Sequence, residues 1–107
     1  MPTPRVINVG VQQAQKIIKE EKDLIIIDVR TSEEYNHGHL RGAKLYPLEQ
    51  LSKKILALEK YKKYPILVYC SSGGRSPSAV KIFLSHGFPK IYHMHQGISA
   101  WPYNLER

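Results

Sequence analysis

Residues 24–28 form an apolar run, Leu24 to Ile27 followed by Asp28, in which polar and apolar residues do not alternate. An unbroken run of this kind, rich in β-branched residues, is expected of a strand covered on both faces in a parallel sheet. A second apolar run occupies residues 66–69, directly after Pro65. Both runs predict an α/β fold in which helices cover the two faces of the sheet.

The rest of the chain alternates between helical and extended patterns. A capping box, Thr31 to Glu34, predicts a short helix that ends at Gly38. Strands that alternate with helices imply βαβ units. We therefore predict a single domain over residues 1–107, with a central, mostly parallel sheet of about five strands flanked by helices on both faces. Further helices are predicted at residues 11–18, 48–58, 76–86 and 97–101, and further strands at residues 6–8, 43–46 and 91–94.

The chain carries a large positive charge. Lys and Arg number 16 against 9 for Asp and Glu, which gives a net charge of +7. Such a surplus attracts anions, and small inorganic ions, acidic partner proteins and nucleic acids all qualify. Five lysines lie within residues 53–63, interleaved with Tyr61. Since no nucleic-acid motif accompanies them, a solvated helix end and loop is favoured over a nucleic-acid surface.

Cys70 is the only cysteine of the sequence. A single thiol excludes an internal disulfide and fits a reducing compartment. We find no apolar stretch typical of a secretory signal or of a membrane-spanning segment. The sequence thus predicts a cytoplasmic protein that does not associate with membranes, and with no coiled-coil heptad a monomer is expected.

The position of Cys70 is typical of a nucleophile. It directly follows the buried strand at residues 66–69 and precedes the helix expected from Ser76. Ligands of parallel sheets bind at the carboxyl ends of strands, and the adjacent helix N-terminus favours a thiolate. A lone cysteine is more often a core residue, but the loop Gly73-Gly74-Arg75 favours the catalytic interpretation here.

The segment after Cys70 has the composition of an anion-binding loop. Gly73 and Gly74 should let the backbone curl, so that successive N–H groups face the sulfur. The planar guanidinium of Arg75 suits an oxyanion. Hydroxyl groups are offered by Ser71, Ser72 and Ser76, and Ser76 is also a candidate cap for the following helix.

No metal site or other cofactor is predicted. His37 and His39 form an i,i+2 pair, as do His93 and His95, but neither pair has a third ligand nearby. We expect these histidines at surface or hydrogen-bonded positions.

Three ordered blocks of residues extend over nearly the whole chain. They are Asp28-Val29-Arg30 with Glu33-Glu34-Tyr35 and Gly38-His39-Leu40-Arg41-Gly42-Ala43, then Cys70-Ser71-Ser72-Gly73-Gly74-Arg75-Ser76, and last Gln96-Gly97-Ile98-Ser99-Ala100-Trp101. Together these blocks make the sequence similar to the single-domain rhodanese (thiosulfate sulfurtransferase) family. In two places the sequence departs from the family pattern: Arg41 replaces the usual proline, and Gln96 replaces a frequent glycine.

The resemblance implies sulfur transfer. The Cys70 thiolate would take a sulfane sulfur from a small anionic donor, thiosulfate or a persulfide, and pass it from a persulfide to cyanide or a thiol. The loop residues 71–76 would bind the donor, and with no second cysteine the sulfur would leave to an outside acceptor. Because this chemistry needs no general base beyond the thiolate, Asp28 and Arg30 are expected to have a structural role, as a hydrogen-bonded pair or a loop anchor.

Two other functions share these residues. The first is a persulfide carrier that relays sulfur to a partner, for which an acidic protein is a candidate, with little turnover on thiosulfate. The second is a phosphatase or arsenate reductase of the related cell-cycle phosphatase type. Those enzymes have a longer loop between cysteine and arginine, and usually a histidine at the position of Tyr69. The four residues between Cys70 and Arg75 make a tighter loop, which favours a single sulfur atom over a phosphoryl group.

Overall fold

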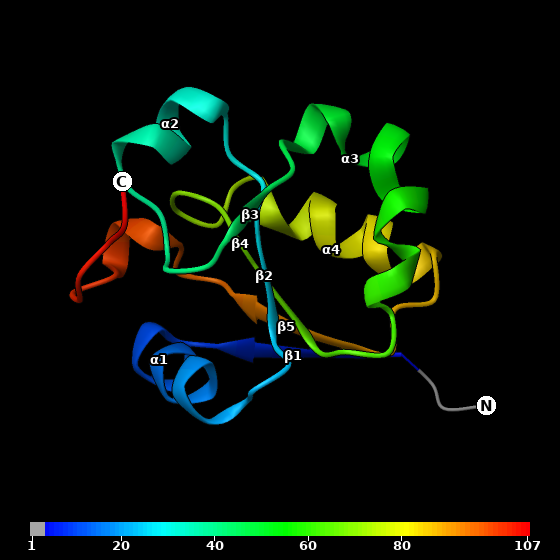
Figure 1. Cartoon of the computed structure of the whole chain (residues 1–107), viewed down its shortest axis with the longest axis horizontal. Helices are drawn as coiled ribbons and strands as arrows, with labels where there is room; N and C mark the ends of the chain where they lie inside the picture. Colours follow the sequence, from blue (N-terminus) through cyan, green and yellow to red (C-terminus); the bar gives the residue numbers. More distant parts are fainter. Residues whose placement is uncertain (1–3) are drawn as a thin grey trace.

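A five-stranded sheet forms the centre of this computed structural model, which describes residues 4–107 (Figure 1). The strand order is β1-β5-β4-β2-β3, and every neighbouring pair of strands is parallel. A single antiparallel bridge outside these strands joins His39 to Glu106. The predicted sheet of about five mostly parallel strands is therefore confirmed. The strands are β1 (Arg5–Val9), β2 (Ile25–Asp28), β3 (Lys44–Leu45), β4 (Ile66–Tyr69) and β5 (Lys90–Met94).

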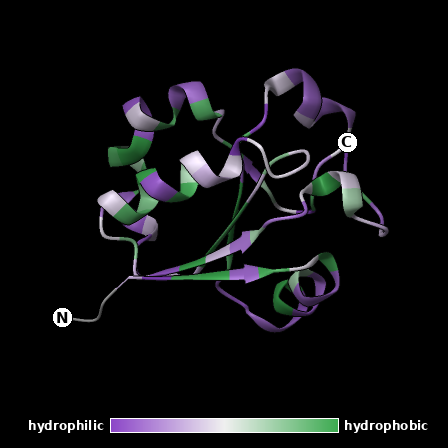
Figure 2. Cartoon of the chain, turned by 180° about the vertical axis from the view of Figure 1, so that it is seen from behind, coloured by the Kyte–Doolittle hydropathy of each residue, from purple (hydrophilic) through white to green (hydrophobic). Residues whose placement is uncertain are grey.

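Helices cover the two faces of the sheet and enclose two apolar clusters. Residues of α3, η1 and α4 build one cluster, and residues of α1 and the chain near η2 build the other. Apolar residues gather on the strands and the inner helix faces, and polar residues cover the outer helix faces (Figure 2). The helices are α1 (Val11–Glu20), α2 (Ser32–His37), α3 (Leu48–Lys54), η1 (Ile55–Tyr61), α4 (Ser76–Ser85) and η2 (Ile98–Ala100).

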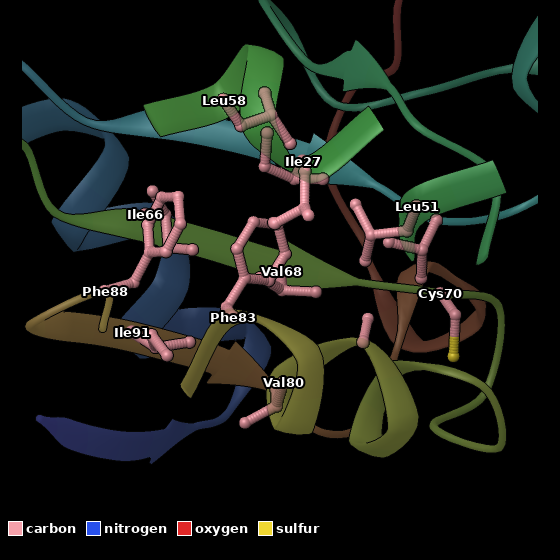
Figure 3. Close-up of a cluster of buried hydrophobic side chains, with 13 residues drawn as sticks. Ile27, Leu51, Leu58, Ile66, Val68, Cys70, Val80, Phe83, Phe88 and Ile91 are labelled. Carbon is pink, nitrogen blue, oxygen red and sulfur yellow. The ribbon is translucent and has the colours of Figure 1, made fainter. Parts of the chain in front are cut away.

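Strand β4 divides its side chains between the two clusters. Val68 and Cys70 pack on the side of α3 and α4, whereas Leu67 and Tyr69 pack on the side of α1. This alternation follows from the two-residue period of a strand. Cys70 lies at the end of its cluster, with its sulfur directed toward the loop that follows β4 (Figure 3). Cys70, the residue after β4, therefore presents its sulfur atom to the loop.

Two predicted elements differ from the structure. The helix predicted over residues 48–58 is two elements, α3 and the 3-10 helix η1. In a 3-10 helix, side chains three residues apart lie on the same face, and Ile55 and Leu58 are both buried in this way. The strand predicted at residues 43–46 is shorter, because only Lys44 and Leu45 pair with β2. The capping box is present: Thr31 accepts from the Glu34 N–H, and the Glu34 carboxylate accepts from the Thr31 N–H.

Within residues 4–107, none of the helices has the length and apolar character needed to cross a bilayer.

Candidate active site

The Cys70 sulfur is surrounded by hydrogen-bond donors from the loop and from the start of α4. The backbone N–H of Gly73 donates to Sγ over 3.2 Å, and the N–H of Ser76 donates over 3.3 Å. The Ser76 hydroxyl oxygen lies 3.4 Å from the same sulfur. The loop thus curls around one atom and directs its polar groups inward, as the sequence predicts.

These donors lower the pKa of the Cys70 thiol. Burial is the largest single influence and raises the pKa, because an ionised sulfur loses its hydration. The hydroxyl and N–H of Ser76, together with the N–H groups of Arg75 and Gly73, act in the opposite direction and outweigh it. The net pKa lies below the ordinary value of 9.0, which favours the nucleophilic thiolate.

The sulfur lies beneath the loop. Cys70 is 1% exposed, whereas Ser72 and Gly74 form an exposed outer rim above it. A surface depression of about 470 Å³ lies beside the loop, and its charged lining residues are Arg30, Arg75, Lys54 and Glu49. Cys70 does not belong to this lining. The loop therefore covers most of Cys70 in this structure.

Arg75 is engaged by a carboxylate of the same chain. Its Nη1 donates to Glu34 Oε1 over 2.6 Å and its Nη2 donates to Oε2 over 2.8 Å. Ser71 Oγ also donates to Glu34 Oε2, over 2.7 Å. The Arg75 hydrogen bonds are the main reason that the pKa of Glu34 lies well below its ordinary range. The guanidinium predicted to bind an oxyanion is thus occupied by the Glu34 carboxylate in this state.

The two loop glycines have different roles. Gly73 has a φ of +91°, and a Cβ there would collide with the carbonyl oxygen of His95. Gly74 has no positive φ, and a Cβ there would meet no atom within 4 Å. The interpretation that both glycines are needed for the curl is therefore wrong for Gly74. A left-handed conformation and a close backbone approach require glycine only at Gly73.

Ser76 does not cap α4 with its side chain. The N-cap is Arg75, and Ser76 is the first helical residue. Its hydroxyl instead lies between Cys70 Sγ and His93 Nε2, the latter at 2.6 Å. The predicted capping role is wrong because the hydroxyl points into the protein, where Ser76 is fully buried.

Asp28 and Arg30 form a buried hydrogen-bonded pair away from the sulfur. Arg30 Nη2 donates to Asp28 Oδ2 over 2.7 Å and also to the carbonyl oxygen of Gly38. Tyr69 OH donates to the same Asp28 oxygen and accepts from the N–H of Leu40. The predicted structural pairing of Asp28 with Arg30 is present, and it ties the end of β2 to the end of β4.

Sequence reasoning missed two residues that contact the loop. The capping box accounts for the presence of Glu34 in the sequence, so the sequence gives no sign that this residue also contacts Arg75 and Ser71. His93 is buried on β5 and contacts Ser76. The signal for His93 was its position two residues after Ile91, which places it on the covered face of a strand, where an imidazole needs partners. Within residues 4–107, no group of three His, Cys, Asp or Glu side chains is arranged to hold a metal ion.

The sequence around this site matches a known protein family. The sequence model of the family described as the rhodanese-like domain matches residues 10–103. The chain belongs to the rhodanese-like domain family. The match includes every element from α1 to η2 and all residues of the Cys70 loop.

Curated relatives of this rhodanese-like chain are longer proteins. An uncharacterized protein of Buchnera aphidicola is 31% identical over 90 residues, which is 83% of this chain and 62% of that protein. A tRNA uridine(34) hydroxylase of Buchnera aphidicola is 32% identical over 108 residues, covering 94% of this chain and 33% of the relative. A tRNA uridine(34) hydroxylase of Cronobacter sakazakii is 32% identical over 83 residues, which is 74% of this chain and 24% of that protein. The chain thus spans less than two thirds of these relatives.

Solved structures show the same fold. A rhodanese-like domain protein from Staphylococcus aureus superimposes with a TM-score of 0.80 at 26% identity, over 94% of this chain and 96% of that one. A rhodanese-related protein from Thermoplasma volcanium gives a TM-score of 0.81 at 23% identity, over 94% and 97%. The predicted rhodanese-like α/β fold is confirmed.

Proposed function

We propose that this protein is a sulfurtransferase that moves a sulfane sulfur from thiosulfate or a persulfide donor to a thiol or cyanide through a persulfide on Cys70. The observation that carries the proposal is the ring of polar groups around Sγ: the N–H groups of Gly73 and Ser76 donate to the sulfur, and the Ser76 hydroxyl oxygen, which accepts from the thiol, lies at 3.4 Å. Such a ring stabilises a thiolate, and it equally stabilises the negative charge of a terminal persulfide sulfur.

The reaction has two steps. The Cys70 thiolate attacks the outer sulfur of thiosulfate, a new sulfur–sulfur bond forms, and the old sulfur–sulfur bond breaks with its electron pair leaving on sulfite. The acceptor, cyanide or a thiolate, then attacks the outer persulfide sulfur, and the electron pair of that bond returns to Cys70. Two transfers through one covalent intermediate give ping-pong kinetics.

The loop residues divide the work of binding. The N–H groups of Gly73 and Ser76 hold the sulfur, and Ser71, Ser72 and Gly74 line the path by which the donor enters. Arg75 binds the sulfonate of thiosulfate, and for this it must release at least part of its contact with Glu34. Entry of the donor and rearrangement of Arg75 therefore belong to the same opening of the loop.

A persulfide carrier is the second candidate, and the burial of the sulfur favours it. A 1% exposed Cys70 protects a bound sulfur from chance acceptors until a partner opens the loop. The positive net charge suits an acidic protein partner. The hydroxylase names belong to relatives of which this chain covers a third or less, so we carry over only the rhodanese-like chemistry.

We further propose that the protein acts as a cytoplasmic monomer that needs no cofactor. A cytoplasmic location is supported by the one reduced cysteine. The proposed chemistry takes place entirely on this sulfur, with no membrane or nucleic acid involved.

Steady-state transfer from thiosulfate to cyanide and to several thiols tests the proposal. Cys70→Ser should abolish transfer and leave the circular dichroism spectrum and melting temperature close to those of the parent. Ser52→Ala, an exposed position on α3, is the matched control and should retain full activity. Transfer that persists in Cys70→Ser would refute the assignment. A stable added sulfur, seen by mass spectrometry together with negligible turnover, would favour the carrier, and aryl phosphate hydrolysis lost in Cys70→Ser would favour a phosphatase.

A further inference from the structure

A row of hydrogen bonds leads from the nucleophile across the sheet to the protein surface. Ser76 Oγ lies 3.4 Å from Cys70 Sγ and 2.6 Å from His93 Nε2. His93 Nδ1 lies 3.1 Å from Asn8 Oδ1. Cys70, Ser76 and His93 are buried, whereas Asn8 is exposed on the edge strand β1. Of these three contacts, only the one between Ser76 and Cys70 belongs to the ring around the sulfur, so the two contacts of His93 call for their own explanation.

The parallel register of the sheet builds this row. Asn8 is the partner of His93 across β1 and β5, so their side chains stand side by side on one face. Val68 is the partner of His93 across β5 and β4, and Cys70 follows two residues later on the same face. Ser76 enters above them as the first residue of α4. Three strands and one helix thus contribute one member each.

The chemistry of each partner fixes the direction of the hydrogen bonds. Asn8 Oδ1 is an acceptor, so the facing Nδ1 of His93 carries a proton and Nε2 of the neutral ring is an acceptor. The Ser76 hydroxyl therefore donates to Nε2, and its oxygen is left to accept from the thiol of Cys70. In the protonated state of the site, the thiol, the Ser76 hydroxyl and the His93 Nδ1–H all donate in the direction that leads from the sulfur to Asn8.

We propose that Cys70, Ser76, His93 and Asn8 form a proton relay in which the thiolate is produced by transfer of the thiol proton to His93. The inference rests on the proposed function in taking Cys70 as the nucleophile. It assigns Ser76 and His93 to the preparation of that nucleophile, without contact to the sulfur donor.

The transfer balances within the row. The S–H bond of Cys70 breaks and its proton binds Ser76 Oγ, while the proton of Ser76 passes to Nε2 of His93. The sulfur keeps its electron pair as a thiolate, and the imidazole becomes an imidazolium. Ser76 now donates to the thiolate and accepts from Nε2–H, and Nδ1–H still donates to Asn8. Each polar atom keeps a partner, and no external base takes part.

The surroundings of His93 favour its protonated form only while Cys70 is ionised. Burial is the main influence that lowers the pKa of His93, and repulsion by His95 adds to it. The residues beside His93 in the sheet are Asn8 on β1 and Val68 on β4, and neither carries a charge. From α4, Ser76 contacts the His93 ring. Arg75, the charged N-cap of α4, is turned to Glu34. The thiolate is therefore the counter-charge that stabilises the imidazolium, and the pair stays neutral overall.

Nuclear magnetic resonance of the His93 ring nitrogens tests the coupling directly. In the parent protein the imidazolium form should persist to a pH at least about one unit higher than in Cys70→Ser, because the variant has no thiolate to balance it. Equal protonation midpoints in the two proteins would overturn the relay. The measurement needs no sulfur donor or sulfur acceptor. Failure of sulfur transfer and failure of the coupling between Cys70 and His93 can therefore be told apart.

Asn8→Asp provides a test of sign. In a relay, a carboxylate beside Nδ1 stabilises the imidazolium and raises the thiolate population at pH 7. Simple repulsion between carboxylate and thiolate would lower that population. The rate of alkylation by iodoacetamide reports the thiolate, and we expect it to rise at least about threefold, well above the effect expected of a screened exposed charge. A rate that falls or stays unchanged contradicts the relay.

Loss-of-relay variants complete the test. His93→Gln keeps a polar side chain that cannot take up a proton, and the apparent pKa of the Cys70 thiol should rise by about one unit, which is a tenfold loss of thiolate at any pH well below that pKa. Tyr92→Phe, buried on the opposite face of β5, is the matched control and should leave this pKa unchanged. Melting temperatures identify any variant that fails to fold, in which case Asn8→Asp, at an exposed site, still decides the question.

Discussion

Glu34 connects three parts of the site through one carboxylate. It accepts from Arg75 through both oxygens, from Ser71 Oγ, and from the N–H and hydroxyl of Thr31. The capping box and the loop after Cys70 are thus joined at a residue far from the loop in sequence. The contact joins the loop to α2, and it also neutralises the cation that an anionic donor would use.

Glu34 should make the stability of the protein depend on pH in the acid range. Because the folded state lowers its pKa below the ordinary 4.5, its stabilising contribution is complete above that pH and is lost as the pH falls further. In urea titrations at pH 7, Glu34→Gln should lose about 1 kcal/mol, since the pair is a third exposed and solvent weakens it. The difference from the parent should shrink below pH 4. Glu33→Gln, an exposed neighbour, should show no such difference; a constant difference at every pH would contradict the argument.

Glu34 and Arg75 should also have opposite effects on the donor. Arg75→Ala removes a charge from the entry path and should raise the KM for thiosulfate by about tenfold, the size of one charge-assisted hydrogen bond. Glu34→Gln releases Arg75 from its carboxylate and should lower that KM. Initial rates at varied thiosulfate, with cyanide held constant, give both values. If Arg75→Ala left the KM unchanged, Arg75 would be a structural partner of Glu34 only.

At the scale of elements, the loop is held from outside by the first two residues of η2. The N–H of Ile98 donates to the carbonyl oxygen of Cys70 over 2.9 Å, and the N–H of Ser99 donates to that of Ser71 over 2.8 Å. Gly97 allows this approach, because it has a φ of +77° and a Cβ there would collide with the carbonyl oxygen of Ser71. The third block of the family pattern therefore acts on the active loop.

Gly97→Ala should consequently impair transfer by moving the loop. The methyl group must displace the backbone of Ser71 and Ser72, and with it the N–H groups that face the sulfur. We expect kcat/KM to fall at least about tenfold and stability to fall by about 1–3 kcal/mol, from strain at a positive φ. Gly42→Ala, also at a positive φ but with no atom within 4 Å of a Cβ, is the control for strain alone. Equal activity losses in the two variants would show that displacement of the loop is unimportant.

Features that depend on neighbouring residues could be predicted from the sequence, whereas features that depend on contacts between distant segments could not. Strand β4 agrees with the predicted residues 66–69, because a buried run after a proline is defined by its own residues. The break between α3 and η1 was not predictable, since the spacing of Ile55 and Leu58 fits an α-helix and a 3-10 helix equally. The loop could be recognised from its own sequence, but His93 reaches it only through the register of β5 beside β4. Local patterns specify the elements, and packing between them completes the site.

At the scale of the whole molecule, the chain carries a large positive charge. The net charge is +7, although in the depression beside the active site Arg30 and Arg75 are paired with Asp28 and Glu34, and Lys54 lies in the same lining as Glu49. A field of this sign concentrates small anions near the protein and is screened by salt. It acts on the encounter with the donor and leaves the chemistry at the buried sulfur unaffected.

Ionic strength should therefore change the second-order rate constant and leave turnover nearly constant. Between about 20 mM and about 200 mM salt the Debye length falls about threefold, so kcat/KM for thiosulfate, a dianion, should fall several-fold while kcat stays level. Alkylation of Cys70 separates this effect from any change in the loop itself. Iodoacetate, an anion, should lose rate with salt, whereas neutral iodoacetamide should not, because both reagents pass the same rim and differ in charge. If salt slowed both reagents equally, the loop would be the salt-sensitive part, and attraction of the donor by the +7 charge would have no role in the rate.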